Sequence, residues 1–254
     1  MSESTIQIRS EGRAAWILLD RAPLNILNVA MMRELREALE TLAPARDVLI
    51  FQGAGPKGFS AGADVGDHTP ERVAEMLDAF HGVFRLLWRA DCLTVAAVHS
   101  WCLGGGCELA SFCDFVVATE SAVFGQPEIK LGAIPPVAMV LLPRLVGPRA
   151  ASDMILTGRN VPAPEAEELG LVTRLLPDEG FEQGVRSLVE ELAGLSPVVL
   201  KLARNELRRR VGLDFERELG EVEAFYLERL IRTSDAAEGV RAFLEKRAPV
   251  WAGK

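Results

Sequence analysis

The chain has few of the residues that hold metals or form disulfides. Its four cysteines form no C-x-x-C pair and its three histidines form no H-x₃₋₅-H pair. The spacings of a structural zinc site are therefore missing, and we expect no metal. The opening MSESTIQIRSEG lacks the apolar segment of a secretory signal peptide. We expect a cytoplasmic protein whose thiols stay reduced and pack as small apolar groups.

Long apolar runs and an excess of positive charge are also missing. No apolar run approaches the roughly 18 residues of a membrane-spanning helix, so we expect no membrane association. The 28 Lys and Arg against 36 Asp and Glu give a net charge of -8, which argues against a nucleic-acid partner. The 254 residues, 49% hydrophobic and 25% charged, are typical of a globular protein with one or two domains.

Apolar runs alternate with amphipathic segments up to about residue 175. The expected strands are 4–9, 14–20, 47–52, 92–100 and 114–120, and the expected helices are 29–43, 70–89 and 107–113. Such alternation predicts an α/β fold with parallel strands and right-handed connections. For the second of these helices, Thr69 is the expected N-cap and Pro70 a first-turn residue.

The rest of the sequence is helical in pattern. Helices are expected over 180–194, 197–211, 214–231 and 234–246. We therefore divide the chain into an α/β core over residues 1–195 and a helical C-terminal region over 196–254. No Pro/Gly/Ser-rich linker separates them, so we expect the helices to pack on the core or on another subunit.

Two glycine-rich segments follow one another after the strand at 47–52. Residues 53–58 (GAGPKG) match the G-x-G-x-x-G pattern of dinucleotide sites, but Gly62 and Gly66 interrupt the helix that should follow. We therefore expect no nicotinamide or flavin cofactor. In residues 58–64 (GFSAGAD), small side chains leave main-chain N–H groups open to a ligand, unless the segment is simply a tight turn.

A third glycine-rich segment joins a buried strand to a short helix. Its glycines at 104–106 leave N–H groups open at a helix N-terminus, which suits stabilisation of a developing oxyanion. Glu108 follows in the first helical turn, where it either only complements the helix dipole or takes part in chemistry. Glu128, twenty residues further on, is either a solvated loop carboxylate or the partner of Glu108 in an acid/base pair.

Positive charge gathers on the helix expected at 197–211. Lys201, Arg204 and Arg208 recur along it. A solvated helix face is the ordinary interpretation, and phosphate binding is the alternative. A serine hydrolase is disfavoured because the sequence has no G-x-S-x-G motif.

Taken together, these segments resemble the enoyl-CoA hydratase/isomerase (crotonase) superfamily. The resemblance is collinear over residues 17–27 (ILLDRAPLNIL), 58–65 (GFSAGADV), 95–132, 156–177 and 235–251. It implies a spiral of repeated ββα turns with a C-terminal helical trimerisation region, and hence a homotrimer or a hexamer built from two trimers. It also implies an acyl-CoA thioester as substrate, with coenzyme A as part of the substrate and no separate cofactor.

The resemblance assigns roles to particular residues of this chain. The amides of Ala63 and Gly105 correspond to the family's oxyanion hole, and Glu108 and Glu128 to the pair that adds water to an enoyl-CoA double bond or removes it. In this pairing Glu128 gives a proton to the α-carbon and Glu108 activates the water. The residues implied to hold coenzyme A are Leu24, Ala61 and Asp64, with Phe243 and Lys246 contributing to a neighbouring subunit's site.

One segment departs from ordinary hydratases. Where these carry a glycine whose N–H is taken to hold the catalytic water, this chain has Pro136, which has no N–H. Water must therefore be held differently, or the acyl pocket is reshaped by Pro136 and the bulkier Val137. His68 either touches the acyl group or belongs to a surface loop.

Residues 60–73 and 124–147 are similar to cyclohexa-1,5-diene-1-carbonyl-CoA hydratases, which act on a cyclic dienoyl-CoA. Three alternatives remain open on the sequence. They are an isomerase that uses Glu128 alone, a hydratase for a branched acyl group such as 3-methylglutaconyl-CoA, and a non-catalytic oligomeric or RNA-binding relative.

Overall fold

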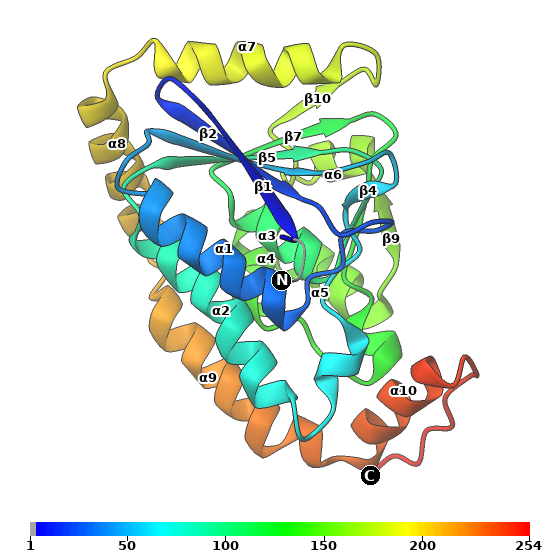
Figure 1. Ribbon diagram of the computed structural model, residues 1–254. Helices are drawn as coiled ribbons and strands as arrows, with labels where there is room; N and C mark the ends of the chain where they lie inside the picture. Colours follow the sequence, from blue (N-terminus) through cyan, green and yellow to red (C-terminus); the bar gives the residue numbers. More distant parts are fainter. Residues whose placement is uncertain (1–3) are drawn as a thin grey trace.

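A computed structural model describes residues 4–254. Residues 1–3, with which the expected 1–195 unit begins, lie outside the described residues. The main sheet has six strands in the order β1-β2-β3-β5-β7-β10 (Figure 1). Its strands are β1 (Ile6–Glu11), β2 (Ala14–Leu19), β3 (Val48–Gly53), β5 (Leu93–Val98), β7 (Phe115–Thr119) and β10 (Arg174–Leu176). β1 and β2 form an antiparallel hairpin, and the pairs from β2 to β10 are parallel, as predicted.

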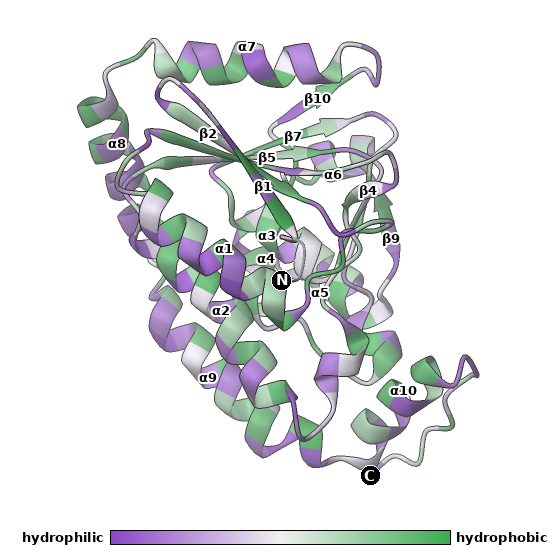
Figure 2. Cartoon of the chain, in the orientation of Figure 1, coloured by the Kyte–Doolittle hydropathy of each residue, from purple (hydrophilic) through white to green (hydrophobic). Residues whose placement is uncertain are grey.

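The strands of the main sheet are apolar because both faces are covered. Side chains of β2 and β3 alternate between the two faces: Ile17 and Phe51 join the large core cluster, whereas Trp16 and Ile50 join a smaller one. Helix α7 (Phe181–Ala193) covers the smaller cluster, and α1 (Val29–Leu42) and α2 (Val73–Arg89) lie on the opposite side (Figures 1 and 2).

A second sheet of short strands was not predicted. It has the order β4-β6-β8-β9, with β4 (Gly58–Ser60), β6 (Trp101–Leu103), β8 (Val123–Gly125) and β9 (Asn160–Pro162). Each strand has three residues and two of them contain glycine, so no period-2 apolar pattern marks them. Successive chain segments place one strand in the main sheet, one in the second sheet, and then a helix. This is the ββα spiral expected from the family resemblance.

The remaining helices follow the spiral. They are α3 (Gly105–Phe112), α4 (Pro136–Leu145), α5 (Pro148–Thr157), α6 (Ala163–Glu168), α8 (Pro197–Arg210), α9 (Phe215–Glu228) and α10 (Ser234–Leu244), with 3₁₀ turns η1 (Val65–His68), η2 (Pro127–Leu131) and η3 (Leu230–Arg232). α9 packs on α2 and α4, and α10 packs on η1 and η2. None of the helices within residues 4–254 has both the length and the apolar character needed to cross a bilayer.

Two helix starts differ from the prediction. α2 begins at Val73, and its N-cap is Arg72 rather than Thr69. Thr69 has extended backbone, and its carbonyl accepts the N–H groups of Arg72 and Val73, which closes a turn before the helix. α3 begins earlier than predicted, at Gly105, because Gly104 takes a φ of 52° and turns the chain directly into the helix.

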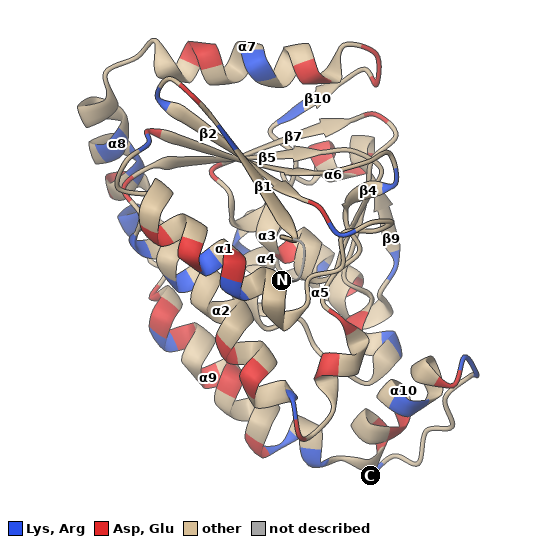
Figure 3. Cartoon of the chain, viewed as in Figure 1, with Lys and Arg blue, Asp and Glu red and all other residues tan. Residues whose placement is uncertain are grey.

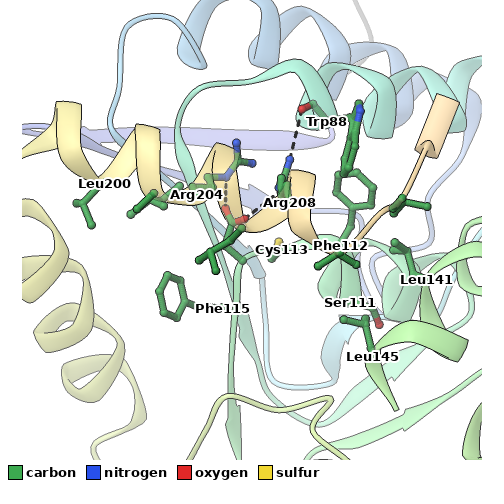
Figure 4. A pocket seen from close by; sticks show the side chains of 16 residues that line it. Trp88, Ser111, Phe112, Cys113, Phe115, Leu141, Leu145, Leu200, Arg204 and Arg208 are labelled. Carbon is green, nitrogen blue, oxygen red and sulfur yellow. Dashed lines mark hydrogen bonds and ion pairs between the residues drawn. The ribbon is translucent and has the colours of Figure 1, made fainter. Parts of the chain in front are cut away.

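The expected solvated face on α8 is wrong for Arg204. Its side chain is only 4% exposed, and its Nε donates to Asp114 Oδ2 at 2.7 Å. Arg208 reaches the other oxygen of Asp114 at 3.1 Å (Figure 4). The phosphate alternative is not favoured either, because a protein carboxylate already occupies the two guanidinium groups. Arg209 and Arg210 do lie on the exposed face, where they pair with Glu206. Figure 3 shows the basic positions that recur along α8.

The Arg204–Asp114 pair ties α8 to the sheet, and its removal should be costly. Arg204→Leu removes the buried guanidinium group that pairs with the Asp114 carboxylate. We therefore expect the free energy of unfolding to fall by about 3 kcal/mol. Urea unfolding measures this directly. Arg210→Leu on the same helix removes an exposed pair and should change stability by less than about 0.5 kcal/mol. Equal losses for the two variants would contradict this view of the pair.

Candidate active site

A cavity of about 680 Å³ opens where loops of the two sheets meet. Its lining comes from the segment after β2, the β4–η1 and β6–α3 loops, η2 and α10. Of the residues singled out in the sequence, it brings together Leu24, Ala61, Ala63, Asp64, His68, Glu128 and Phe243. Gly104 also lines it, which places the glycine-rich turn before α3 at the same space.

A second hollow, of about 500 Å³, lies beneath α8 (Figure 4). Its lining is mostly apolar, with Phe112, Phe115 and Leu200 among its side chains, and its charged groups are the paired Asp114, Arg204 and Arg208. Asp114 is the only carboxylate among the lining residues and is paired with both arginines, so this lining supplies no unpaired carboxylate. The chemistry therefore belongs to the first cavity.

Two main-chain N–H groups are left open at this cavity. Within residues 4–254, the amides of Ala63 and Gly105 have no acceptor, whereas those of Gly62, Asp64 and Gly104 all donate hydrogen bonds. The two open amides lie close together, since a Cβ built on Gly105 would be 3.3 Å from the Ala63 nitrogen. The same Cβ would be 2.9 Å from Phe80 Cζ, so this approach requires glycine.

Glu108 lies in the first turn of α3, but its carboxyl hydrogen-bonds to another helix, α4. Its side chain is buried, and Oε1 accepts the Ala138 N–H at 2.9 Å. The positive N-terminal end of α4 thus faces Glu108. Burial raises the pKa of Glu108 to about 7, and the main-chain N–H groups of Ala138 and Val137 limit the rise.

Glu128 is not the solvated loop carboxylate that the sequence left open. It is half-buried in the cavity wall, and its Oε2 is buried without a hydrogen-bond partner among residues 4–254. A Cβ on Gly104 would be 2.7 Å from Glu128 Oε1, so the carboxyl lies against the glycine turn. Burial, and then the charge of Glu108, raise the pKa of Glu128 well above its usual range. The charge of Glu108 thus contributes to the raised pKa of Glu128, while Glu108 itself is not among the residues that line the cavity.

Tyr226 on α9 was missed in the sequence. The side chain is 2% exposed, and burial, with the charges of Glu128 and Glu108 added to it, raises the pKa of its phenol. Tyr226 is the only tyrosine of the chain, and its presence on a core-facing helix is the one signal that was available. Gln126, beside Glu128 in sequence, also has a buried side-chain amide with both atoms unpaired.

The residues implied to contact coenzyme A form one edge of the cavity. Ala61 donates its N–H to the Leu24 carbonyl at 2.9 Å, and Asp64 caps η1 by accepting the Gly66 N–H. Phe243 lines the cavity of its own chain, whereas Lys246 is exposed and outside the lining. The neighbouring subunit's site expected for both residues stays a prediction.

The remaining acyl-pocket residues fall into two groups. His68 lines the cavity, and burial lowers its pKa while its Nδ1 lies 3.1 Å from the Asp64 carbonyl oxygen. Pro136 and Val137 are buried and are not among the residues that line the cavity. They form the start of α4, where the Ala138 N–H donates to Glu108.

The raised pKa of Glu108 makes stability depend on pH. The folded protein keeps this proton up to about pH 7, whereas an unfolded chain releases it near 4.5, so stability falls as pH rises through this interval. Glu108→Gln keeps an acceptor for Ala138 but does not titrate. We expect the stability of wild type relative to this variant to drop by about 2 to 3 kcal/mol between about pH 5 and pH 8.

Urea unfolding at several pH values measures this difference. The exposed Glu179 supplies a matched control, since Glu179→Gln should track wild type at every pH. A constant difference between wild type and Glu108→Gln would show that Glu108 titrates normally.

Comparison with known proteins identifies the family. A sequence model of the Enoyl-CoA hydratase/isomerase family matches residues 10–254. The chain is 35% identical to the cyclohexa-1,5-dienecarbonyl-CoA hydratase of Thauera aromatica, with 99% of each chain covered. It is 39% identical to a probable enoyl-CoA hydratase of Rhizobium meliloti, with 97% of each chain covered.

A solved structure gives the same result. An enoyl-CoA hydratase from Mycobacterium avium subsp. paratuberculosis superposes with a TM-score of 0.88 at 26% identity, over 98% of each chain. The resemblance in the sequence segments and the ββα spiral are both confirmed. The chain belongs to the enoyl-CoA hydratase/isomerase family.

Proposed function

We propose that this protein is a hydro-lyase that adds water to the double bond of an enoyl-CoA thioester, or removes it, with Glu108 and Glu128 as its acid/base pair. The observation that carries the proposal is that Ala63, with its open amide, and Glu128 line one cavity, and that the open amide of Gly105 lies close to Ala63. Glu108 is buried in the helix that begins at Gly105 and is not itself among the lining residues. Relatives named enoyl-CoA hydratases cover the whole chain and support the same reaction class.

The two amides explain how charge on the thioester would be stabilised. The carbonyl oxygen sits between the N–H groups of Ala63 and Gly105, at the N-terminus of α3. When water adds at the β-carbon, electron density moves onto this oxygen and forms an enolate. Donors that are already in place need no reorganisation, and each is worth about 3 kcal/mol in comparable sites.

The two carboxyls differ in protonation, as acid and base must. The pKa of Glu108 near 7 leaves it partly ionised at neutral pH, while the more strongly raised pKa of Glu128 keeps that group protonated. Water gives a proton to Glu108 as its oxygen bonds to the β-carbon, and Glu128 gives its proton to the α-carbon. Dehydration runs the same steps in reverse, and coenzyme A enters only as part of the substrate.

A cyclic conjugated dienoyl-CoA is the proposed substrate. The full-length likeness to the hydratase of Thauera aromatica supports it, and the cavity is large enough to hold an acyl group together with part of its thioester arm. A panel of linear, branched and cyclic acyl-CoA esters, followed by mass spectrometry, tests the choice. Gain or loss of one water indicates hydration or dehydration, and a moved double bond without a change in mass indicates the isomerase alternative.

A homotrimer, or a hexamer of two trimers, is proposed for the assembly. Apolar side chains stand exposed along α8, and they include Val198, Val199, Leu202, Leu207 and Val211. Exposed apolar faces of this kind favour burial against another subunit.

Replacement of the acid Glu128 by glutamine should slow turnover strongly without abolishing binding. For Glu128→Gln we expect kcat to fall at least about 100-fold, because proton transfer by a positioned acid contributes about 10²–10⁴. The dissociation constant of a saturated acyl-CoA should stay within about twofold, since the amides and the cavity walls are unchanged. Hydration assays measure kcat and calorimetry measures the dissociation constant, with Glu179→Gln as the control for both. Full activity in Glu128→Gln would refute the assignment.

The rate should depend on pH through the coupled glutamate pair. The profile of kcat/KM reports the free enzyme, so we expect it to rise with pH through about 7 as Glu108 loses its proton. It should fall again at higher pH when Glu128 ionises, and the two limbs belong to the pair as a whole. A rise centred near 4.5, the ordinary value for a glutamate, would contradict the buried base.

A further inference from the structure

We infer that Ser60 is a positioning residue that holds the Ala63 amide ready for the thioester oxygen, and that Asn25 is the support to which Ser60 is fixed. The inference rests on the proposed function in one respect, namely that the Ala63 amide receives this oxygen. Three observations carry it: a buried chain of hydrogen bonds, the pairing of the amides beside Ala63, and the contact of Ser60 with the second glycine turn.

The buried chain of hydrogen bonds runs from the segment after β2 to the loop that carries Ala63. Ser60 and Asn25 are both fully buried. The Ser60 hydroxyl donates to the Asn25 main-chain carbonyl at 2.8 Å and accepts the Gly62 N–H at 3.2 Å. A hydroxyl suits this place because it donates and accepts at the same time. Ser60 therefore joins two segments that are far apart in the sequence.

Asn25 is itself held in place on several sides. It has a φ of 51°, a left-handed conformation that asparagine tolerates better than most residues. Its side-chain amide donates to the carbonyl oxygens of Ala54 and Gly58, both at 3.0 Å, and its Oδ1 accepts the Arg21 N–H at 3.1 Å. The carbonyl to which Ser60 donates is therefore a fixed point.

The amides beside Ala63 are all paired, whereas its own amide has no acceptor among residues 4–254. The N–H groups of Ala61 and Asp64 donate to main-chain carbonyls. The Gly62 N–H differs, because its acceptor is a side chain, that of Ser60. Ser60 is therefore the acceptor in this loop that a substitution can remove while the main chain stays the same.

Ser60 also packs against the turn that carries the second open amide. A Cβ built on Gly106 would be 2.7 Å from Ser60 Cβ and 3.0 Å from Ser60 Oγ. A Cβ on Gly62 would be 3.3 Å from the Gly105 nitrogen. Ser60 thus contacts one of the two segments that carry the open amides and hydrogen-bonds to the other, so it fixes how they lie relative to each other.

The role of Ser60 follows from these contacts. Ser60 is not among the residues that line the cavity, so it acts through the main chain and moves no proton. Gly62 has a φ of 99°, and a glycine leaves the peptide that follows free to rotate unless a bond fixes it. The Ser60 hydroxyl supplies that bond. The Ala63 N–H then points at the oxygen before the enolate forms, and it needs no reorganisation during the reaction.

Ser60→Ala removes the hydroxyl and leaves the Gly62 N–H without its acceptor. We expect kcat for hydration to fall about 10- to 100-fold, because a small misplacement of an oxyanion donor costs much of its effect. The dissociation constant of a saturated acyl-CoA should change less than about threefold, since the amide binds the enolate more strongly than the carbonyl of the ground state.

Infrared spectroscopy of a bound ester measures the amide directly. Butyryl-CoA and cyclohexanecarbonyl-CoA, isotope-labelled at the thioester carbon, serve as probes that do not react with water. Hydrogen bonds from the two amides polarise the carbonyl, so its stretching frequency should fall when either ester binds to wild type. In Ser60→Ala the fall should be smaller. A carbonyl shift equal to that of wild type, or an unchanged kcat, would overturn the inference.

Ser111→Ala is the matched control for a merely structural role. Ser111 is buried, and its hydroxyl donates to the main-chain carbonyl of Cys107 at 2.6 Å, but it lines the hollow beneath α8. This variant should lose a comparable hydrogen bond and yet keep the carbonyl shift of wild type, with kcat within about twofold. An equal loss of the shift in both variants would mean that Ser60 only stabilises the fold.

The same spectra separate this inference from the proposed function. A wild type that lowers the carbonyl frequency but adds water to no ester of the panel would overturn the hydration reaction, while the comparison with Ser60→Ala would still decide the role of Ser60. A wild type that binds neither ester, or binds one without a shift of its carbonyl, would overturn the use of the two amides and the role of Ser60 together.

Discussion

The hydrogen bond from the Ala138 N–H to Glu108 is the interaction on which the site depends. A buried carboxylate without donors is too costly to hold in this core, and the amides at the start of α4 are what lets Glu108 ionise near neutral pH. Burial and the charge of Glu108 raise the pKa of Glu128 well above its usual range, and its Oε2 has no hydrogen-bond partner among residues 4–254. The proposed division into acid and base depends on this difference between the two carboxyls.

The spiral fold explains why these groups meet. Each ββα turn passes from the main sheet to the second sheet and then into a helix, so the ends of β4, β6 and β8 lie side by side. The open amides follow β4 and β6, and Glu128 follows β8. Residues separated by dozens of positions therefore line one cavity, and glycine at 104 and 105 permits the close approach.

Part of this arrangement could be predicted from the sequence. Buried strands such as 48–53 and 93–98 were recognisable because long apolar runs need cover on both faces. The glutamates and glycine loops could be named through the family resemblance, but not their contacts. The second sheet could not be predicted, because three-residue strands carry no periodic signal. Arg204 and Tyr226 were misjudged or missed, because a helix sequence alone does not say which buried group lies opposite.

A crystal structure with a bound acyl-CoA tests the account most directly. We predict that the thioester oxygen lies about 3 Å from the nitrogens of both Ala63 and Gly105, with the Cα–Cβ bond between the carboxyls of Glu108 and Glu128. A thioester bound elsewhere, such as in the hollow beneath α8, or carboxyls on the same side of that bond and out of reach of it, would contradict the account.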